Sequence, residues 1–142
     1  MEWLDGDPGY TKLRVRQASG TRTGSAYLYT AGGSQYNTSA STGNTQSFGG
    51  YNDDKIKLAN WGVGDTEQSK DTNLWVYHPM NAANQRPYLH YSTWGKSPSN
   101  EWQNIQGFGY IDESTNWTGL HLYNNGGVSA RWQVVVYGYK HA

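Results

Sequence analysis

Acidic side chains are the first candidates for chemistry, because two carboxyl groups held across a glycosidic bond can hydrolyse it. The chain has 11 acidic residues among 142, and two of them, Asp53 and Asp54, are adjacent. Adjacent side chains of an extended chain point to opposite faces, so these two do not form such a pair. With Asn52 they offer the oxygen ligands that Ca²⁺ prefers, but the spacing of an EF-hand loop is absent. We expect a polar turn before a strand.

Histidine and cysteine patterns give no sign of a metal centre. The chain has no cysteine, and no zinc-motif spacing occurs around His78, His90, His121 and His141. His90 and His121 lie at alternating positions of predicted strands and could meet across a sheet. No G-x-S-x-G, P-loop or dinucleotide motif is present. We therefore predict no catalytic residue, no metal and no cofactor. A hydrolase is the alternative, and it needs a converging pair among Asp53, Asp54, Asp65, Glu67, Asp71, Glu101, Asp112 and Glu113.

Aromatic side chains are the remaining candidates for function. The chain has 7 Trp and 12 Tyr against 2 Phe, which is more than one small core needs. Such rings fill a sandwich core, anchor a protein interface or stack on sugars, and all three roles stay open here. Alternation places Trp75 and Tyr77 opposite Leu74 and Val76, which makes this pair our first choice for a contact surface. The candidates for interface or ligand contacts are Tyr36, Trp75, Tyr77, Tyr91 and Trp94.

The charge balance argues against several classes of partner. Eleven basic and eleven acidic residues cancel, and the pI is near 6.9. We therefore expect neither nucleic acid nor an anionic membrane as a partner. No apolar run approaches the roughly 20 residues of a membrane span. Residues 1–7 lack the basic and apolar regions of a signal peptide, so we expect synthesis in the cytoplasm without a secretion signal.

The segments that must position these side chains alternate polar and apolar residues with period two, as half-buried strands do. In residues 10–16, for example, Leu13 and Val15 share one face and three cations share the other. Similar runs cover 24–30, 55–61, 73–78, 87–94, 101–111, 117–123 and 130–140. About eight strands separated by Gly, Asn, Asp and Ser predict an all-β fold. We expect a jelly-roll β-sandwich of two antiparallel sheets, as one domain over residues 1–142.

Three polar segments are predicted to connect strands. Residues 31–50 are almost all Gly, Ser, Thr, Asn and Gln, so we expect a long surface loop or a weak edge strand there. Residues 62–72 are expected to form a second loop. The tetrapeptide 124–127, Asn-Asn-Gly-Gly, suits a tight turn. It is predicted to join 119–123 to 130–140 as a hairpin, which would tie the C-terminus into a sheet.

The end of the chain resembles a recurrent ending of tailed-phage virion proteins. Residues 116–127 read NWTGLHLYNNGG, and residues 132–140 read WQVVVYGYK. In that family, a strand and a Gly/Asn turn precede a last strand that ends in LYGI, and the tetrad here is Val136-Tyr137-Gly138-Tyr139. The front is similar too, because residues 10–16 and 22–30 match the family's first two strands, and a polar loop with a tyrosine follows.

This resemblance implies a jelly-roll domain displayed on a phage particle. Because the chain begins with its own Met and comprises only this domain, we expect a structural virion protein that decorates the capsid, as cement or knob proteins do. The alternative is a receptor-binding or lectin-like module of a tail or head fibre, with aromatics on host glycans. The implied partners are the major capsid protein, or a tail or fibre component, and further copies of the chain. Trimers are common where such proteins sit on threefold sites.

Overall fold

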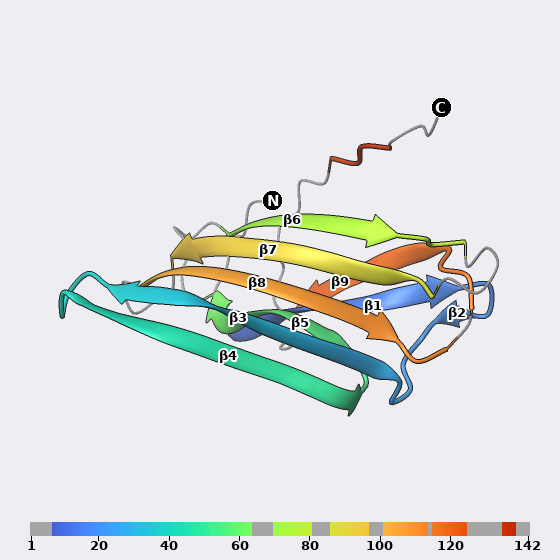
Figure 1. Cartoon of the computed structure of the whole chain (residues 1–142), viewed down its shortest axis with the longest axis horizontal. Helices are drawn as coiled ribbons and strands as arrows, with labels where there is room; N and C mark the ends of the chain where they lie inside the picture. The colour runs from blue at the N-terminus through green and yellow to red at the C-terminus, as the bar shows by residue number, and fades with distance from the viewer. Residues whose placement is uncertain are drawn as a thin grey trace.

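The described part of the chain is mostly strand. The computed structural model describes residues 7–63, 70–80, 86–96, 101–113, 115–124 and 135–138, and nine strands form within them (Figure 1). They are β1 (Asp7–Gln17), β2 (Gly20–Thr21), β3 (Tyr27–Asn37), β4 (Thr42–Asp53), β5 (Ile56–Val63), β6 (Lys70–Tyr77), β7 (Tyr88–Lys96), β8 (Glu101–Ile111) and β9 (Gly119–Asn124).

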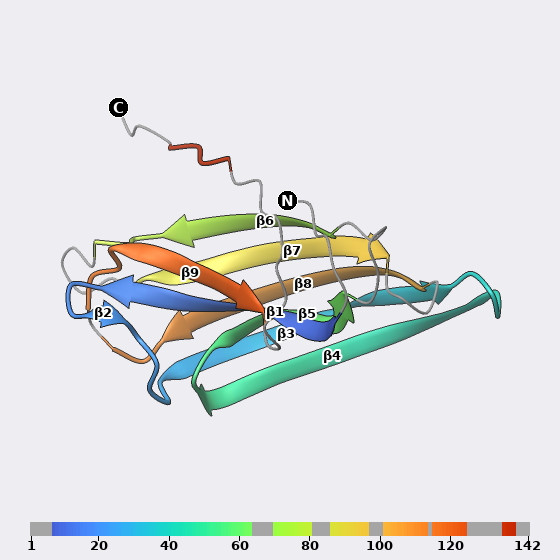
Figure 2. The ribbon, with the colours of Figure 1, turned by 180° about the vertical axis from the view of Figure 1, so that it is seen from behind.

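The strands form two antiparallel sheets packed face to face (Figures 1 and 2). One has five strands in the order β4-β3-β8-β7-β6, and the other has four strands with β1 at its centre. Leu13 of β1 pairs with Ile56 of β5 and with Leu122 of β9, so β5 and β9 occupy opposite edges of β1. The predicted all-β sandwich of two antiparallel sheets is confirmed.

Three strand pairs join segments far apart in the chain, and one of them is the pair of β1 with β5. β1 pairs with β9, and β3 pairs with β8, so early strands lie beside late ones, as in the nested pairs of a jelly roll. The other pairs of the five-stranded sheet are local, because the β3–β4 hairpin and the β6-β7-β8 meander stay within it. The chain changes sheets between β2 and β3, β4 and β5, β5 and β6, and β8 and β9.

Apolar side chains from both sheets fill the space between them. Leu13 and Val15 are fully buried, as their alternation with cations predicts. Glycines make room for large rings, since a Cβ on Gly107 would overlap the ring of Tyr91, its cross-strand partner. The core consists of Leu13, Val15, Ala26, Tyr27, Tyr29, Ala31, Ile56, Leu58, Ala59, Leu89, Tyr91, Ile105, Ile111 and Trp117.

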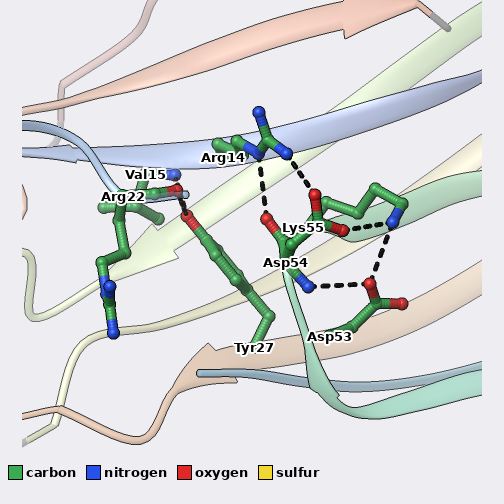
Figure 3. Close-up of polar contacts among 7 residues, drawn as sticks. All are labelled: Arg14, Val15, Arg22, Tyr27, Asp53, Asp54 and Lys55. Carbon is green, nitrogen blue, oxygen red and sulfur yellow. Dashed lines mark hydrogen bonds and ion pairs between the residues drawn. The ribbon is translucent and has the colours of Figure 1, made fainter. Parts of the chain in front are cut away.

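Buried tyrosine hydroxyls connect the two sheets. Tyr27 Oη of β3 accepts a hydrogen bond from the backbone N–H of Val15 at 2.9 Å and donates one to the carbonyl of Arg22 at 2.8 Å (Figure 3). Tyr91 Oη of β7 donates to the carbonyl of Lys57 in β5 at 2.7 Å. These side chains therefore fill the core with their rings and satisfy backbone groups of the opposite sheet with their hydroxyls.

An ion-pair network holds the crossing from β4 to β5 (Figure 3). The Asp54 carboxylate pairs with Arg14 of β1 and with Lys55, and Arg14 Nε donates to the Asp54 carbonyl at 2.9 Å. Lys55 Nζ also lies 2.9 Å from Asp53 Oδ1. The predicted polar turn is confirmed. The expectation of opposed carboxylates is wrong, because the chain bends here, with φ 53° at Asn52, and both carboxylates reach Lys55.

Replacing Asp54 with Asn is expected to lower the free energy of unfolding at pH 7 by about 1 kcal/mol. Burial disfavours the ionised carboxylate, but hydrogen bonds from Lys55 and Arg14 outweigh it and hold the pKa well below its ordinary value. This stabilisation is present above the ordinary pKa of 3.8 and is lost as the pH falls below it. Urea denaturation measures the cost, with Asp112→Asn as the control, because its pair with Arg86 is more exposed. Equal costs for the two variants would contradict the prediction.

Residues 31–50 are not a loop. Residues 31–37 belong to β3, residues 42–50 belong to β4, and the turn at 38–41 joins them; the two strands pair without interruption from Thr30 and Gly49 to Asn37 and Thr42. The edge-strand alternative is correct for 42–50, since β4 lies at the edge of the five-stranded sheet, but not for 31–37, since β3 lies between β4 and β8. The tip of this hairpin projects beyond the four-stranded sheet (Figure 1). The strands lie beyond the core there, so they pair without the alternating apolar side chains from which a strand is predicted.

The predicted C-terminal hairpin is absent from the described residues. β9 pairs with β1, and residues 135–138 lie outside any strand, with exposed side chains. The rest of the predicted last strand, the turn at 125–127 and residues 64–69 of the second predicted loop lie outside the described residues, whereas 70–72 belong to β6. Alternation predicts that β9 has one buried face, but it does not predict that β9 pairs with β1.

Candidate binding face

One side of the five-stranded sheet faces away from the four-stranded sheet, and we call it the outer face. Every second residue of each strand lies on this face, and the register aligns these residues in rows across the sheet. Two neighbouring rows at one end contain mostly rings: Tyr77, Tyr88, Tyr110 and Leu28 in the first, and Trp75, His90, Phe108 and Thr30 in the second.

The rings of these two rows form what we call the proximal cluster: Trp75, Tyr77, Tyr88, His90, Phe108 and Tyr110. Trp75 stacks on His90 with ring centroids 5.1 Å apart, and Tyr77 stacks on Tyr88 at 4.7 Å. Tyr88 contacts Phe108 at 5.5 Å, which links β7 to β8. Trp75, Tyr77 and Phe108 keep 38%, 39% and 41% of their surface exposed. Cross-strand stacking thus orients the rings while leaving large parts of them in solvent.

Three more aromatic side chains, which we call the distal group, lie at the other end of the outer face. Tyr36 of β3 is directly opposite Trp102 of β8. Trp94 of β7 lies one row away, opposite Asn104 of β8. All three rings are exposed. The outer face therefore carries exposed rings at both of its ends.

A polar band lies between the proximal cluster and the Tyr36–Trp102 pair, and its second row also contains Trp94 of the distal group. It contains amide and hydroxyl side chains from all five strands: Asn73, Ser92, Gln106 and Ser47 in one row, and Asn104, Ser34 and Thr45 in the next. Because Gly32 has no side chain, an open hollow of about 270 Å³ forms beside it, and Thr30, His90, Gln106 and Phe108 also line it. A ligand in this hollow would meet ring edges and hydrogen-bonding groups together.

The outer surfaces of the two sheets differ in charge. The four-stranded sheet carries cations on its outer side, where the Arg14 guanidinium lies 4.9 Å from the Tyr123 ring centroid. These cations are Arg14, Arg16 and Lys57, whereas Lys12 on the same side of β1 is buried. On the outer face of the five-stranded sheet, the charged groups among the described side chains are Asp71 and Lys96, both near the distal group. The aromatic face is therefore nearly neutral, which suits an uncharged ligand or a protein surface of low charge.

Comparison with known proteins identifies no relative. No protein-family model, curated protein or solved structure matches the chain. The described residues include no helix that is long and apolar enough to cross a membrane.

Four of the five predicted contact residues lie on the outer face. Trp75 and Tyr77 belong to the proximal cluster, and Tyr36 and Trp94 belong to the distal group. Tyr91 is wrong as a contact residue, because it is fully buried. It shares strand parity with the core residue Leu89 and not with Trp94, so its ring packs between the sheets.

Sequence reasoning missed five members of the outer face. Three of them lie on β8, where even-numbered residues alternate with the buried Gln103, Ile105 and Gly107. The period-two alternation of β8 is the sequence signal that indicates its outward side. The missed residues are Tyr88, His90, Trp102, Phe108 and Tyr110.

Carboxylates and histidines do not converge on the outer face. Among the described residues, Asp112 pairs with Arg86 and Glu113 with Arg22, and the hollow has no carboxylate in its lining. His90 and His121 do not meet across a sheet, because they lie in different sheets. Asp65 and Glu67 lie outside the described residues. No group of three or more metal-ligating side chains occurs in the described part of the chain.

Proposed function

We propose that this chain is a non-catalytic attachment protein on the surface of a tailed-phage particle, most simply a capsid decoration protein, and that its outer face makes the contact. The observation that carries the proposal is the exposure of rings from four strands on one nearly neutral sheet face. Clustered exposed aromatics of this kind mark protein interaction sites, because their burial removes much apolar surface from water at little cost in side-chain entropy. The resemblance of residues 10–16, 22–30, 116–127 and 132–140 to phage virion proteins supports the location.

The double variant Trp75→Ala/Tyr77→Ala is expected to bind particles of the parent virus at least about tenfold more weakly than the unaltered protein, since contact aromatics commonly contribute more than about 1.4 kcal/mol. Cosedimentation of purified protein with intact particles measures the affinity. Tyr137→Ala is the matched control, because Tyr137 is 83% exposed but lies outside the sheets. If the unaltered protein binds no particle and is missing from purified virions, the proposal fails.

Glycan binding by the same face is the second candidate, and the order of its rows favours it. A protein interface usually has an apolar centre and a polar rim. Here the rings stand at the ends, and the amides and hydroxyls of the polar band lie between them. Sugar rings could stack on the proximal cluster and the distal group while their hydroxyl groups bond to the band.

Filling the hollow separates these two candidates. Gly32→Val is expected to abolish binding on a glycan array if a sugar occupies the hollow, because the new side chain projects into it. The backbone tolerates this change, since a Cβ on Gly32 would lie 3.5 Å from the carbonyl oxygen of Gln46, an ordinary contact. A decoration protein should be silent on the array with or without the substitution and should still cosediment with particles.

A further inference from the structure

The outer edge of β4 is the longest strand edge that the described residues leave without a neighbour. β4 has twelve residues and pairs with β3 on one side, and no other described strand pairs with it. Both ribbon views show it as the outermost strand of the five-stranded sheet (Figures 1 and 2). At about 3.4 Å per residue, this edge offers backbone donors and acceptors over roughly 40 Å.

Over residues 42–50, this edge also lacks the features that normally prevent strands from pairing. Natural edge strands are protected by lysine, proline, bulges or short length. From Thr42 to Gly50, β4 has no charged residue and no proline, and its register with β3 is uninterrupted between Thr42 and Gly49. The opposite edge strand, β6, is shorter and begins with Lys70 and Asp71. The contrast between the two edges marks β4 as the one that suits a partner strand.

We infer that two copies of this chain pair through β4, antiparallel and about a twofold axis at Gln46, so that the two five-stranded sheets become one continuous sheet. An identical strand fits because an uncharged edge does not repel its own copy. Gln46 sets the register because it is the middle residue of the uncharged stretch from Thr42 to Gly50, so pairing about it lets the two stretches overlap along their whole length. The flanking pairs are then Thr45 with Ser47 and Asn44 with Phe48.

The geometry of this pairing has a consequence for binding. An antiparallel pair of identical edge strands has its twofold axis perpendicular to the sheet, so both outer faces point to the same side. The dimer therefore presents two proximal clusters and two distal groups on one surface. Two weak contacts made together bind far more tightly than either alone. Dimerisation itself does not depend on the proposed function, and its failure would leave that proposal standing.

Light scattering of the purified protein tests the dimer directly. We expect twice the chain mass of 15.9 kDa. The double variant Thr45→Lys/Ser47→Lys puts four lysines around the axis and is expected to raise the dimer dissociation constant at least 100-fold. Thr23→Lys/Ser25→Lys is the matched control, because it changes the same residue types at the same spacing at exposed positions away from the axis. A single-chain mass at high micromolar concentration, a three-chain mass, or a dimer that survives the β4 lysines would overturn the inference.

A cysteine on the axis gives an independent test of the register. The natural chain has no cysteine, so Gln46→Cys introduces one thiol per copy. Directly opposed residues of an antiparallel pair have Cα atoms about 4.5–5.5 Å apart, which is within reach of a disulfide. Mild oxidation should therefore convert Gln46→Cys to a covalent dimer, whereas Ser25→Cys should stay monomeric on a denaturing gel. Equal cross-linking of the two variants would overturn the register, even if the protein were dimeric.

Discussion

Replacing Gly33 with alanine is expected to destabilise the fold by about 3 kcal/mol or more, which is a large share of the stability of a domain this size. Gly33 of β3 pairs with Ile105 of β8. A Cβ at this position would overlap the carbonyl oxygen of Asn104 and lie 2.9 Å from the Cα of Ile105. These are backbone atoms of the neighbouring strand, so the clash is relieved only by separating β3 from β8, one of the three long-range strand pairs of the fold.

The adjacent glycine provides the control for this prediction. Gly32→Ala is expected to be neutral, or to stabilise the fold by about 0.5 kcal/mol, because alanine loses less backbone entropy on folding than glycine does. Its Cβ would make only an ordinary contact, 3.5 Å from Gln46 O. Thermal and urea denaturation of both variants would measure the difference. Equal stability of Gly33→Ala and Gly32→Ala would show that β3 and β8 do not approach each other closely enough to exclude a Cβ at residue 33.

The protein is expected to lose most of its stability between pH 10 and 12. Burial raises the pKa of Tyr27 and of Tyr29 to about 12, and it also raises the pKa of Tyr91. A tyrosine whose folded pKa exceeds its unfolded pKa of 10 stabilises the fold fully below pH 10, and this contribution is lost as the pH rises toward the folded value. Each pKa unit is about 1.4 kcal/mol, so the combined loss is several kcal/mol.

Melting temperatures measured from pH 8 to 12, together with the ultraviolet absorbance of tyrosinate, test this prediction. The part of the absorbance change that comes from the buried Tyr27, Tyr29 and Tyr91 should appear in the same pH range in which the fold melts. Tyr51→Phe is the control, because Tyr51 is 78% exposed and its removal should leave the pH of melting unchanged. Tyr27→Phe should lower stability at pH 7 as well, since the hydrogen bonds with Val15 and Arg22 are lost. Gradual ionisation of all tyrosines near pH 10 in a folded protein would contradict the prediction.

Local alternation was sufficient for most strands and for their faces. It placed Leu13 and Val15 in the core, and it placed Trp75 and Tyr77 on the opposite side from Leu74 and Val76, as the structure has them. It could not decide the role of each ring. Tyrosine suits both a core and a wet surface, because it has an apolar ring and a polar hydroxyl. Tyr91 went to the core because its ring lies over Gly107 and its hydroxyl reaches the Lys57 carbonyl, and neither partner is near it in sequence.

The sequence by itself determined that this protein is all-β, which residues of most strands face inward, and that its aromatics exceed what the core requires. All of these follow from side-chain type and from a period of two residues, which are local properties. Only the tertiary structure decided that Tyr36, Trp75 and Phe108 share one face, that residues 31–50 form a hairpin, and that β9 pairs with β1. These features depend on strand order and register, which are set by packing between segments far apart in the chain.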